Sequence, residues 1–180
     1  MDEAQVIARV RGGTTEAFGE IVEHYQTPIV RYLLRMTGDV NVAEDLAQDT
    51  FIQAYKSILK TTSELSLKAW LYKIATNNAR QFHRPAAAAL VHSADRLREV
   101  SGTETENSPN SVVERTAIEE ALVRVPHEQR VCMALHFVEG LKYREIADIV
   151  SVSEEAVRKR VARGSKEFRT VYRATSGEED

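Results

Sequence analysis

Apolar residues recur at intervals of three and four along most of the chain, a period that predicts amphipathic helices rather than strands. In the N-terminal half the pattern predicts helices over residues 15–36, 41–59 and 67–83. In the C-terminal half it predicts helices over residues 117–125, 127–139, 143–150 and 153–173. We therefore expect an all-α fold.

Punctuating residues give the N-terminal helices their expected limits. Pro28 should kink or split the first helix, since proline lacks a backbone donor. Asn41 and Glu44 fit a capping box that would open the second. In the third, Trp70 and Tyr72 should lie near an exposed polar side. Its expected core positions are Leu67, Leu71, Ile74, Ala75 and Phe82.

The C-terminal helices are short and closely connected. Pro126 should stop one helix, and Gly140 should end the next with positive φ. A turn at Ser151 and Val152 follows, and Ser153 is a good N-cap for the last helix. The expected inward residues are Val131, Ala134, Leu135, Val138, Ile146, Ala147 and Val150. Two short helices joined by such a turn predict a helix-turn-helix.

Charge makes that last helix distinctive. The chain has a formal net charge of −3, yet this helix carries a cluster of cations. They are Arg158, Lys159, Arg160, Arg163, Lys166, Arg169 and Arg173. A local basic stripe favours phosphate contact, and a solvated surface helix is the alternative. Val157, Val161 and Phe168 are expected to pack into the core.

Two further groups of side chains carry weaker signals. Glu44, Asp45, Gln48 and Asp49 form an acidic cluster near a helix start, where either the helix dipole or a partner-binding face accounts for them. A divalent-ion site at Asp45 and Asp49 is the least favoured interpretation. Cations and amides interleaved with aromatics between residues 67 and 84 suit single-stranded nucleic acid, in which bases stack on rings.

Composition excludes several classes. The histidines are scattered, there is one cysteine, and the phosphate-binding, dinucleotide-binding and nucleophile-elbow motifs are missing, so we expect no catalytic activity, metal or cofactor. Cys132 should be a core thiol in a reducing cytosol. No apolar run reaches membrane-spanning length and no secretory signal is evident, so we expect a cytoplasmic protein without membrane contact of its own.

Several segments, in order, resemble the extracytoplasmic-function sigma factors of bacterial RNA polymerase. They are AFGEIVEHY, RMTGD, AEDLAQDTFIQAY, WLYKIATNNAR, ALVRVPHEQR, LKYREIADIVSVS and AVRKRVARG. The resemblance implies two helical domains, a region 2-like domain over 1–85 and a region 4-like helix-turn-helix domain over 114–174. Residues 86–113, rich in small and polar residues, should form a flexible linker. A disordered acidic tail is expected over 175–180.

The resemblance also implies functional residues. Core polymerase would be bound by Arg35, Glu44, Asp45, Gln48, Asp49 and Phe51. The −10 promoter element, with one unstacked base captured, would be held by Thr61, Thr62, Ser63, Lys68, Trp70, Lys73, Asn77, Asn78, Arg80 and Arg84. The duplex −35 element would be read by Ser153, Glu154, Glu155, Arg158, Lys159, Arg160, Arg163 and Lys166. An anti-sigma factor is a further implied partner.

Some residues depart from the family pattern. The −10 helix ends in Gln81-Phe82-His83-Arg84-Pro85 instead of a dense basic run, and Ser151 replaces a common glycine. Glu154 and Glu155 would accept from cytosine amino groups or cap the helix dipole, so the bases read at −35 stay open. The alternative functions are a stand-alone helix-turn-helix regulator, with an N-terminal dimerisation or sensing domain, and a protein that sequesters another factor.

Overall fold

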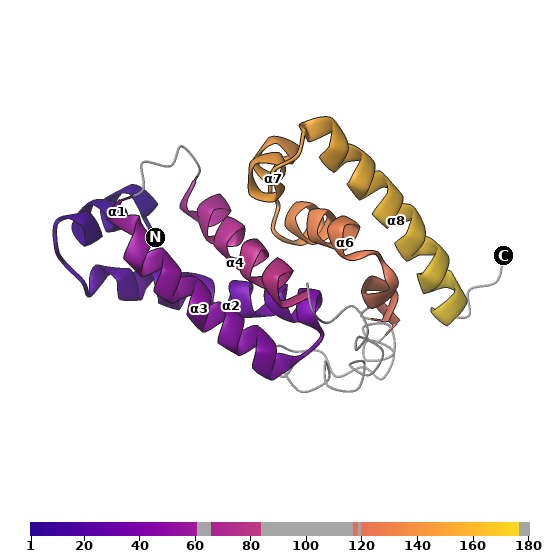
Figure 1. Ribbon diagram of the computed structural model, residues 1–180, viewed down its shortest axis with the longest axis horizontal. Helices are drawn as coiled ribbons and strands as arrows, with labels where there is room; N and C mark the ends of the chain where they lie inside the picture. The colour runs from indigo at the N-terminus through magenta and orange to yellow at the C-terminus, as the bar shows by residue number, and fades with distance from the viewer. Residues whose placement is uncertain (61–65, 84–116, 119, 177–180) are drawn as a thin grey trace.

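The computed structural model describes residues 1–60, 66–83, 117–118 and 120–176. Every element in these residues is helical, which confirms the all-α prediction (Figure 1). The elements are α1 (Glu3–Arg11), α2 (Ala17–Thr37), α3 (Val40–Ile58), α4 (Leu67–His83), α6 (His127–Met133), the π-helix η2 (Ala134–Val138), α7 (Tyr143–Val150) and α8 (Glu154–Ser176). None of these helices is both long enough and apolar enough to cross a lipid bilayer.

The N-terminal half is built on α2, which packs against α1, α3 and α4. Pro28 lies inside α2, yet the helix is continuous, so the predicted split does not occur. Ile29 and Tyr25 are both buried on either side of Pro28. Burial of this apolar stripe offsets the one backbone hydrogen bond that proline removes.

The predicted cap of α3 is wrong by two residues. Asp39 is the N-cap, and its carboxylate accepts hydrogen bonds from the backbone N–H groups of Asn41 at 2.9 Å and Val42 at 3.2 Å. Gly38 has φ of 71° and ends α2, so the chain turns sharply there. Asp39 is the first residue in extended conformation after the turn, which gives its side chain the capping position.

The C-terminal half surrounds Val131, Leu135, Ile146 and Val157, all fully buried as predicted. Residues 117–118 and 120–124 are also helical. Cys132 is buried and unpaired, as predicted. Burial raises the pKa of its thiol, which keeps the side chain neutral.

A π-helical turn changes the side-chain register near the end of the second helix in this half. The Glu139 N–H donates to the Ala134 carbonyl at 3.1 Å, an i to i+5 bond, and Gly140 then turns with φ of 70°. The extra residue in this turn rotates the side chains that come after it around the helix axis. Val138, predicted to face inward, is consequently exposed, and Phe137 beside it is 63% exposed.

The two halves lie side by side, with α4 in contact with α3 on one side and α7 on the other (Figure 1). Buried residues of both halves join in one apolar core. The predicted linker over 86–113 lies outside the described residues, and the two-domain division at residues 85 and 114 stays a prediction. Residues 175–176, assigned to the acidic tail, lie instead in α8, which continues to Ser176. Residues 177–180 lie outside the described residues.

Candidate nucleic-acid interface

The helix-turn-helix is formed by α7 and α8. Ser151 at the turn has φ of 57°, in the left-handed region that favours glycine. The Ser153 hydroxyl accepts from the Ala156 N–H at 3.2 Å, which confirms the predicted N-cap. Val157 and Val161 are buried against the rest of this half, as predicted, while Phe168 is only half-buried. This packing fixes which side of α8 faces outward.

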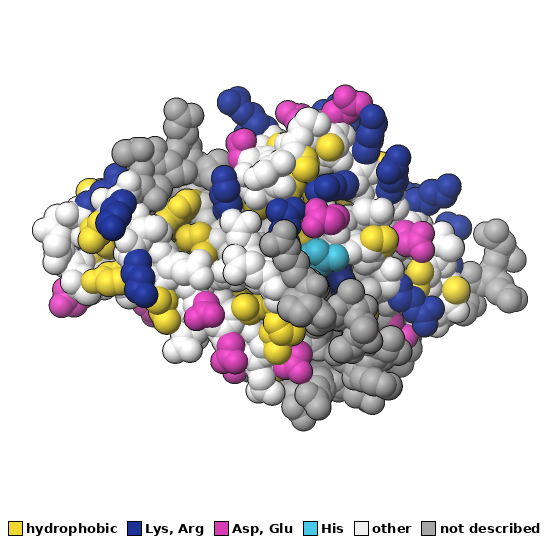
Figure 2. All heavy atoms as spheres, viewed as in Figure 1, with side chains coloured by type: hydrophobic (Ala, Val, Ile, Leu, Met, Phe, Trp, Pro, Cys, Tyr) yellow, Lys and Arg dark blue, Asp and Glu magenta, His cyan; other side chains and the backbone are white. Residues whose placement is uncertain are grey.

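Six cations of α8 are exposed: Arg158, Lys159, Arg163, Lys166, Arg169 and Arg173. Figure 2 shows Lys and Arg side chains gathered along the edge of the molecule where α8 runs. The guanidinium of Arg158 also lies over the Tyr143 ring, 5.7 Å from its centroid. A cationic stripe exposed on the second helix of a helix-turn-helix is suited to a DNA groove.

The acidic start of α8 pairs with these cations. Arg158 lies 3.1 Å from Glu154, and Lys159 lies 2.7 Å from Glu155, each one helical turn away. All four side chains are largely exposed, so each pair contributes at most about 1 kcal/mol. Both cations are therefore available to phosphate or base edges at little cost.

Arg160 differs from its neighbours on α8. Its side chain is half-buried, and its Nη1 atom lies 2.9 Å from the Glu128 carboxylate of α6. It was predicted to contact DNA with the others. In this structure Arg160 lies on the side of α8 that faces α6, where it pairs with Glu128. A residue two positions after Arg158 lies on a different face of the helix.

Close packing between α6 and α8 depends on Gly164. A Cβ atom at this position would lie 2.5 Å from the Met133 sulfur and 3.1 Å from the Gln129 Cβ atom. Only a residue without a side chain fits here unless Met133 moves. Sequence periodicity gave no signal for this contact, since Gly164 lies within the cationic run.

The cationic helix α4 presents a different surface. Asn77 is exposed, whereas Lys68, Trp70 and Lys73 are half-buried. Tyr72, predicted near the exposed side, is fully buried with its ring against Tyr32. Phe82, predicted to face the core, is instead exposed. The predicted −10 residues Thr61, Thr62, Ser63 and Arg84 lie outside the described residues.

Asn78 was predicted to contact the −10 strand, but it is 6% exposed and bonded within the fold. Its amide nitrogen donates to the Thr50 hydroxyl at 3.1 Å, and its carbonyl accepts from the Gln53 amide at 3.1 Å. Both polar ends are thus used between α3 and α4. In this structure Asn78 is a packing residue, because tertiary contacts override its place beside Asn77.

Two cationic residues of α4, Arg80 and Lys68, contact the other half of the molecule. Arg80 lies 3.0 Å from Glu128, and its guanidinium also donates to the Val150 carbonyl at 3.4 Å. Lys68 donates to the backbone carbonyl of Glu139. These contacts could not be predicted from the sequence, because the partners lie far apart along the chain.

The acidic cluster of α3 lies on the molecular surface. Glu44, Asp45, Gln48 and Asp49 are all exposed. Phe51, assigned to the same contact, is 8% exposed and supports this face from within. Arg35 is half-exposed, and its Nη1 atom lies 4.0 Å from the Glu139 carboxylate. The large apolar residues Ile52, Tyr55 and Leu59 extend the exposed face toward the end of the helix, which sequence analysis missed.

An apolar cavity of about 300 Å³ is lined mainly by the C-terminal half. Its lining includes Leu122, Met133, Phe137 and Phe168 from the C-terminal half and Arg35 from α2. It was not predicted from the sequence, because it depends on the π turn that exposes Phe137. Among the described residues no group of three or more His, Cys, Asp or Glu side chains is placed to hold a metal ion.

Comparison with known families accounts for both halves. The Sigma-70 region 2 model matches residues 21–88, and the Sigma-70, region 4 model matches residues 115–168. The chain is 28% identical over 177 residues to the ECF RNA polymerase sigma factor SigW of Bacillus subtilis, covering 93% of this chain and 95% of that protein. It is 29% identical over 175 residues to the ECF RNA polymerase sigma-E factor of Haemophilus influenzae, covering 91% of each.

Solved structures share the fold. CnrH in complex with the cytosolic domain of CnrY superposes with a TM-score of 0.71 at 19% identity, covering 96% of this chain and 97% of that one. The sigma factor RpoE in complex with the anti-sigma factor NepR, from Bartonella quintana, gives a TM-score of 0.68 at 19% identity, covering 87% of this chain and 96% of that one.

Proposed function

The chain belongs to the sigma-70 family, in its extracytoplasmic-function group, and is therefore an alternative sigma factor that directs core RNA polymerase to specific promoters; we propose which of its residues do so. Residues 1–85 bind core polymerase and the −10 element, and residues 114–174 read the −35 element. The observation that carries this assignment is the helix-turn-helix with its outward cationic stripe, in a chain whose two halves match sigma regions 2 and 4.

At −35, the start of α8 enters the major groove. Arg158 and Lys159 leave their ion pairs with Glu154 and Glu155 and contact the DNA instead. Arg163 and Lys166 bind phosphates. Once released, Glu154 and Glu155 are free to accept from cytosine amino groups. Ser153 stays the helix cap, and Arg160 supports α8 through Glu128 rather than touching bases.

At −10, α4 contacts the unpaired strand. Trp70 supplies a ring for stacking, Asn77 a polar contact, and Lys73 a cation, joined by Lys68 and Arg80. A stacked base gains about 1–3 kcal/mol, which is of the same order as the few kcal/mol needed to unstack and unpair it. Thr61, Thr62 and Ser63 are assigned to the captured base, and Arg84 to the strand, on the resemblance alone.

Core polymerase is bound by the exposed face of α3. Glu44, Asp45, Gln48 and Asp49 supply charge and polarity, and the apolar residues Ile52, Tyr55 and Leu59 supply contact area. Replacing Asp45 or Asp49 with Lys should weaken binding to core polymerase about tenfold, with the melting temperature unchanged. Glu16→Lys, an equal charge change at an exposed residue just before α2, is the control. Unchanged affinity for core polymerase would indicate that Asp45 and Asp49 serve only to stabilise the start of α3.

We further propose that the protein has no catalytic activity of its own and acts in the cytoplasm, where polymerase and promoters are. An anti-sigma factor covers the sigma factor when the sigma factor is inactive. Phe137 and Val138, which are exposed and line the apolar cavity, suit contact with a protein partner. Co-purification with core polymerase and with a second small protein would identify both partners.

Reconstituted transcription is the direct test. Purified protein added to core polymerase should yield RNA with defined start sites on genomic templates, and sequencing those starts gives both promoter elements. The isolated protein should bind the same duplexes poorly. Tight binding of the free protein to a two-fold symmetric site, with no promoter-dependent RNA, would instead identify a stand-alone regulator.

A further inference from the structure

The last helix, α8, continues past the part of the chain that matches sigma region 4. The match ends at residue 168, whereas α8 runs from Glu154 to Ser176. Arg169 and Arg173 lie in this extension, and both side chains are exposed. At about 1.5 Å per residue, Arg173 lies about 22 Å along the helix from Arg158. The extension therefore carries two further cations beyond the residues proposed to read bases.

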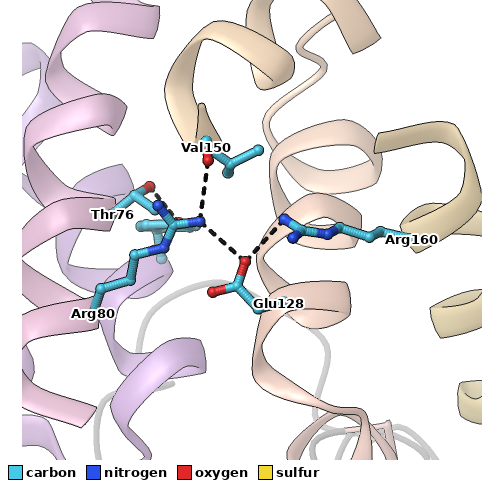
Figure 3. A network of polar contacts seen from close by, with 6 residues as sticks. Thr76, Arg80, Glu128, Val150 and Arg160 are labelled. Carbon is cyan, nitrogen blue, oxygen red and sulfur yellow. Dashed lines mark hydrogen bonds and ion pairs between the residues drawn. The ribbon is translucent and has the colours of Figure 1, made fainter. Parts of the chain in front are cut away.

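Contacts with α6 determine which face of α8 is turned outward. The Arg160 Nη1 atom lies 2.9 Å from the Glu128 carboxylate of α6 (Figure 3). Gly164 approaches Met133 of the same helix so closely that a Cβ atom would lie 2.5 Å from the sulfur. Both contacts lie on one side of α8, since residues four apart are neighbours on a helix. The opposite side of α8 faces solvent.

Arg169 and Arg173 lie on that solvent side, in line with Arg158. Successive residues of an α-helix are about 100° apart, so Arg169 lies about 20° around the axis from Arg158. By the same rule, Arg173 lies about 60° and Lys166 about 80° from Arg158. All four side chains are exposed. The outward face of α8 is thus one cationic stripe that continues into the last turn of the helix.

A solvated surface helix is the alternative explanation for this stripe, and the charge pattern disfavours it. Such a helix is typically lined by acids and bases at spacings of three and four. Glu167 is the one acid of α8 after Glu155, and it lies about 180° around the axis from Arg158. In the part of the chain that the structure describes, neither Arg169 nor Arg173 lies in an ion pair.

The helix dipole is a second alternative, because it favours cations near a helix C-terminus. Its effect is confined to the last turn, which includes Arg173 and not Arg169. Arg169 is oriented by another contact, in which its Nε atom donates to the Ser165 carbonyl at 3.0 Å. Its two terminal nitrogens make no hydrogen bond within the described residues. A guanidinium held in this way has a pair of donors that fits the oxygens of a phosphate.

We propose that Arg169 and Arg173 bind backbone phosphates of duplex DNA beside the −35 element, outside the bases that α8 reads. This inference rests on the proposed −35 role of α8. The major groove winds around the DNA axis while α8 continues along one line, so the helix meets base edges only near its start (Figure 1). Farther along the same face, the cations reach phosphates at the border of the groove. A distance of about 22 Å corresponds to at most about six base pairs.

The salt dependence of duplex binding tests this proposal in the complex of the full chain with core polymerase. Two fluorescent duplexes carry a promoter identified from mapped transcript starts. The short duplex ends at the borders of the −35 element, and the long one adds about ten base pairs, one turn of DNA, on each side. The test variant is Arg169→Gln with Arg173→Gln. The control is Arg31→Gln with Arg124→Gln, an equal charge change at exposed residues outside α8.

The long duplex should separate the test variant from the control. The slope of log affinity against log salt should be smaller by about 2, because each phosphate contact contributes about 0.9. Affinity at low salt should be about tenfold lower than in the control. On the short duplex the two variants should bind equally. A base substitution within the −35 element should weaken both by the same factor, since phosphate contacts carry no sequence information.

Equal salt slopes for the test variant and the control on the long duplex would overturn the proposal. An equal loss on both duplexes would place Arg169 and Arg173 within the −35 element, and weaker binding to core polymerase itself would indicate a protein contact. Either result also overturns the proposal. The −35 role of α8 is tested separately by Arg158→Glu with Lys159→Glu, which should weaken binding to both duplexes. Normal binding by that variant would contradict the proposed function, whatever the result for Arg169 and Arg173.

Discussion

The two cationic helices, α4 and α8, use their charges in opposite ways. On α8 the outward cations Arg158 and Lys159 pair with glutamates of the same helix, one turn away and in solvent. On α4, Arg80 and Lys68 pair with groups on the other half of the molecule. Pairs within one helix leave the cations of α8 on an exposed surface, whereas pairs between the halves make the positions of the α4 cations depend on how the halves pack.

Charge reversal on α8 should have the largest effect. Arg158→Glu with Lys159→Glu should lower affinity for −35 duplex about a hundredfold or more in the polymerase complex, since each lost contact costs about 1–3 kcal/mol. The packing between the halves should not change, because both residues pair with glutamates of α8 itself. Full promoter activity in this variant would remove α8 from −35 recognition.

Substitution of Gly164, where α8 closely approaches Met133 of α6, should have the next largest effect. Gly164→Leu places a side chain against Met133, and overpacking of this kind costs about 1–3 kcal/mol of unfolding free energy. Denaturant unfolding measures the loss. Ala162→Leu, on the exposed side of the same helix, is the matched control and should leave stability nearly unchanged. Equal stability in the two variants would show that Met133 moves aside at no cost.

Removing the acids of α8 should sharpen the contrast with α4. Glu154→Gln with Glu155→Gln frees Arg158 and Lys159, and should raise duplex affinity in the polymerase complex roughly threefold at low salt, in keeping with the small energy of exposed pairs. A salt titration of binding measures this gain, which should shrink as salt increases. A large loss of affinity at particular promoters would instead show that the glutamates read bases.

Backbone strain in the helix-turn-helix gives the smallest effect. Ser151 is held at φ of 57°, so Ser151→Gly should stabilise the protein by up to about 1 kcal/mol in thermal unfolding. Ser153→Gly, at the cap in the same turn, should have no such benefit because it removes the Ser153 hydrogen bond. A destabilised Ser151→Gly variant would mean that the serine side chain contributes more than its backbone costs.

Local signals predicted much of this fold. The limits of α4 and α7 agree with the sequence pattern to the residue, because apolar spacing and flanking polar residues mark both ends. The Ser153 cap and the Gly140 turn were predicted for the same reason. The capping-box pattern predicted Asn41 as the cap of α3, whereas Asp39 is the cap, since the sequence does not show that Gly38 ends α2 so abruptly.

Nonlocal packing accounts for what the sequence did not predict. The π turn exposes Val138 by inserting one residue, which no apolar periodicity reveals. The family resemblance assigned Asn78 to the −10 strand, but its side-chain amide bonds to Thr50 and Gln53 of α3. Arg80 and Glu128 are 48 residues apart along the chain, so their pairing follows only from how the halves meet.

Lysine acetylation followed by mass spectrometry tests the contrast between the two helices most directly. In the free wild-type chain at low salt, Lys159 and Lys166 should react quickly, while Lys68 should react slowly, and Lys73 serves as a reference on α4. A wild-type Lys68 that reacts as fast as Lys159 would contradict the account, because its ammonium would then not be held by the C-terminal half.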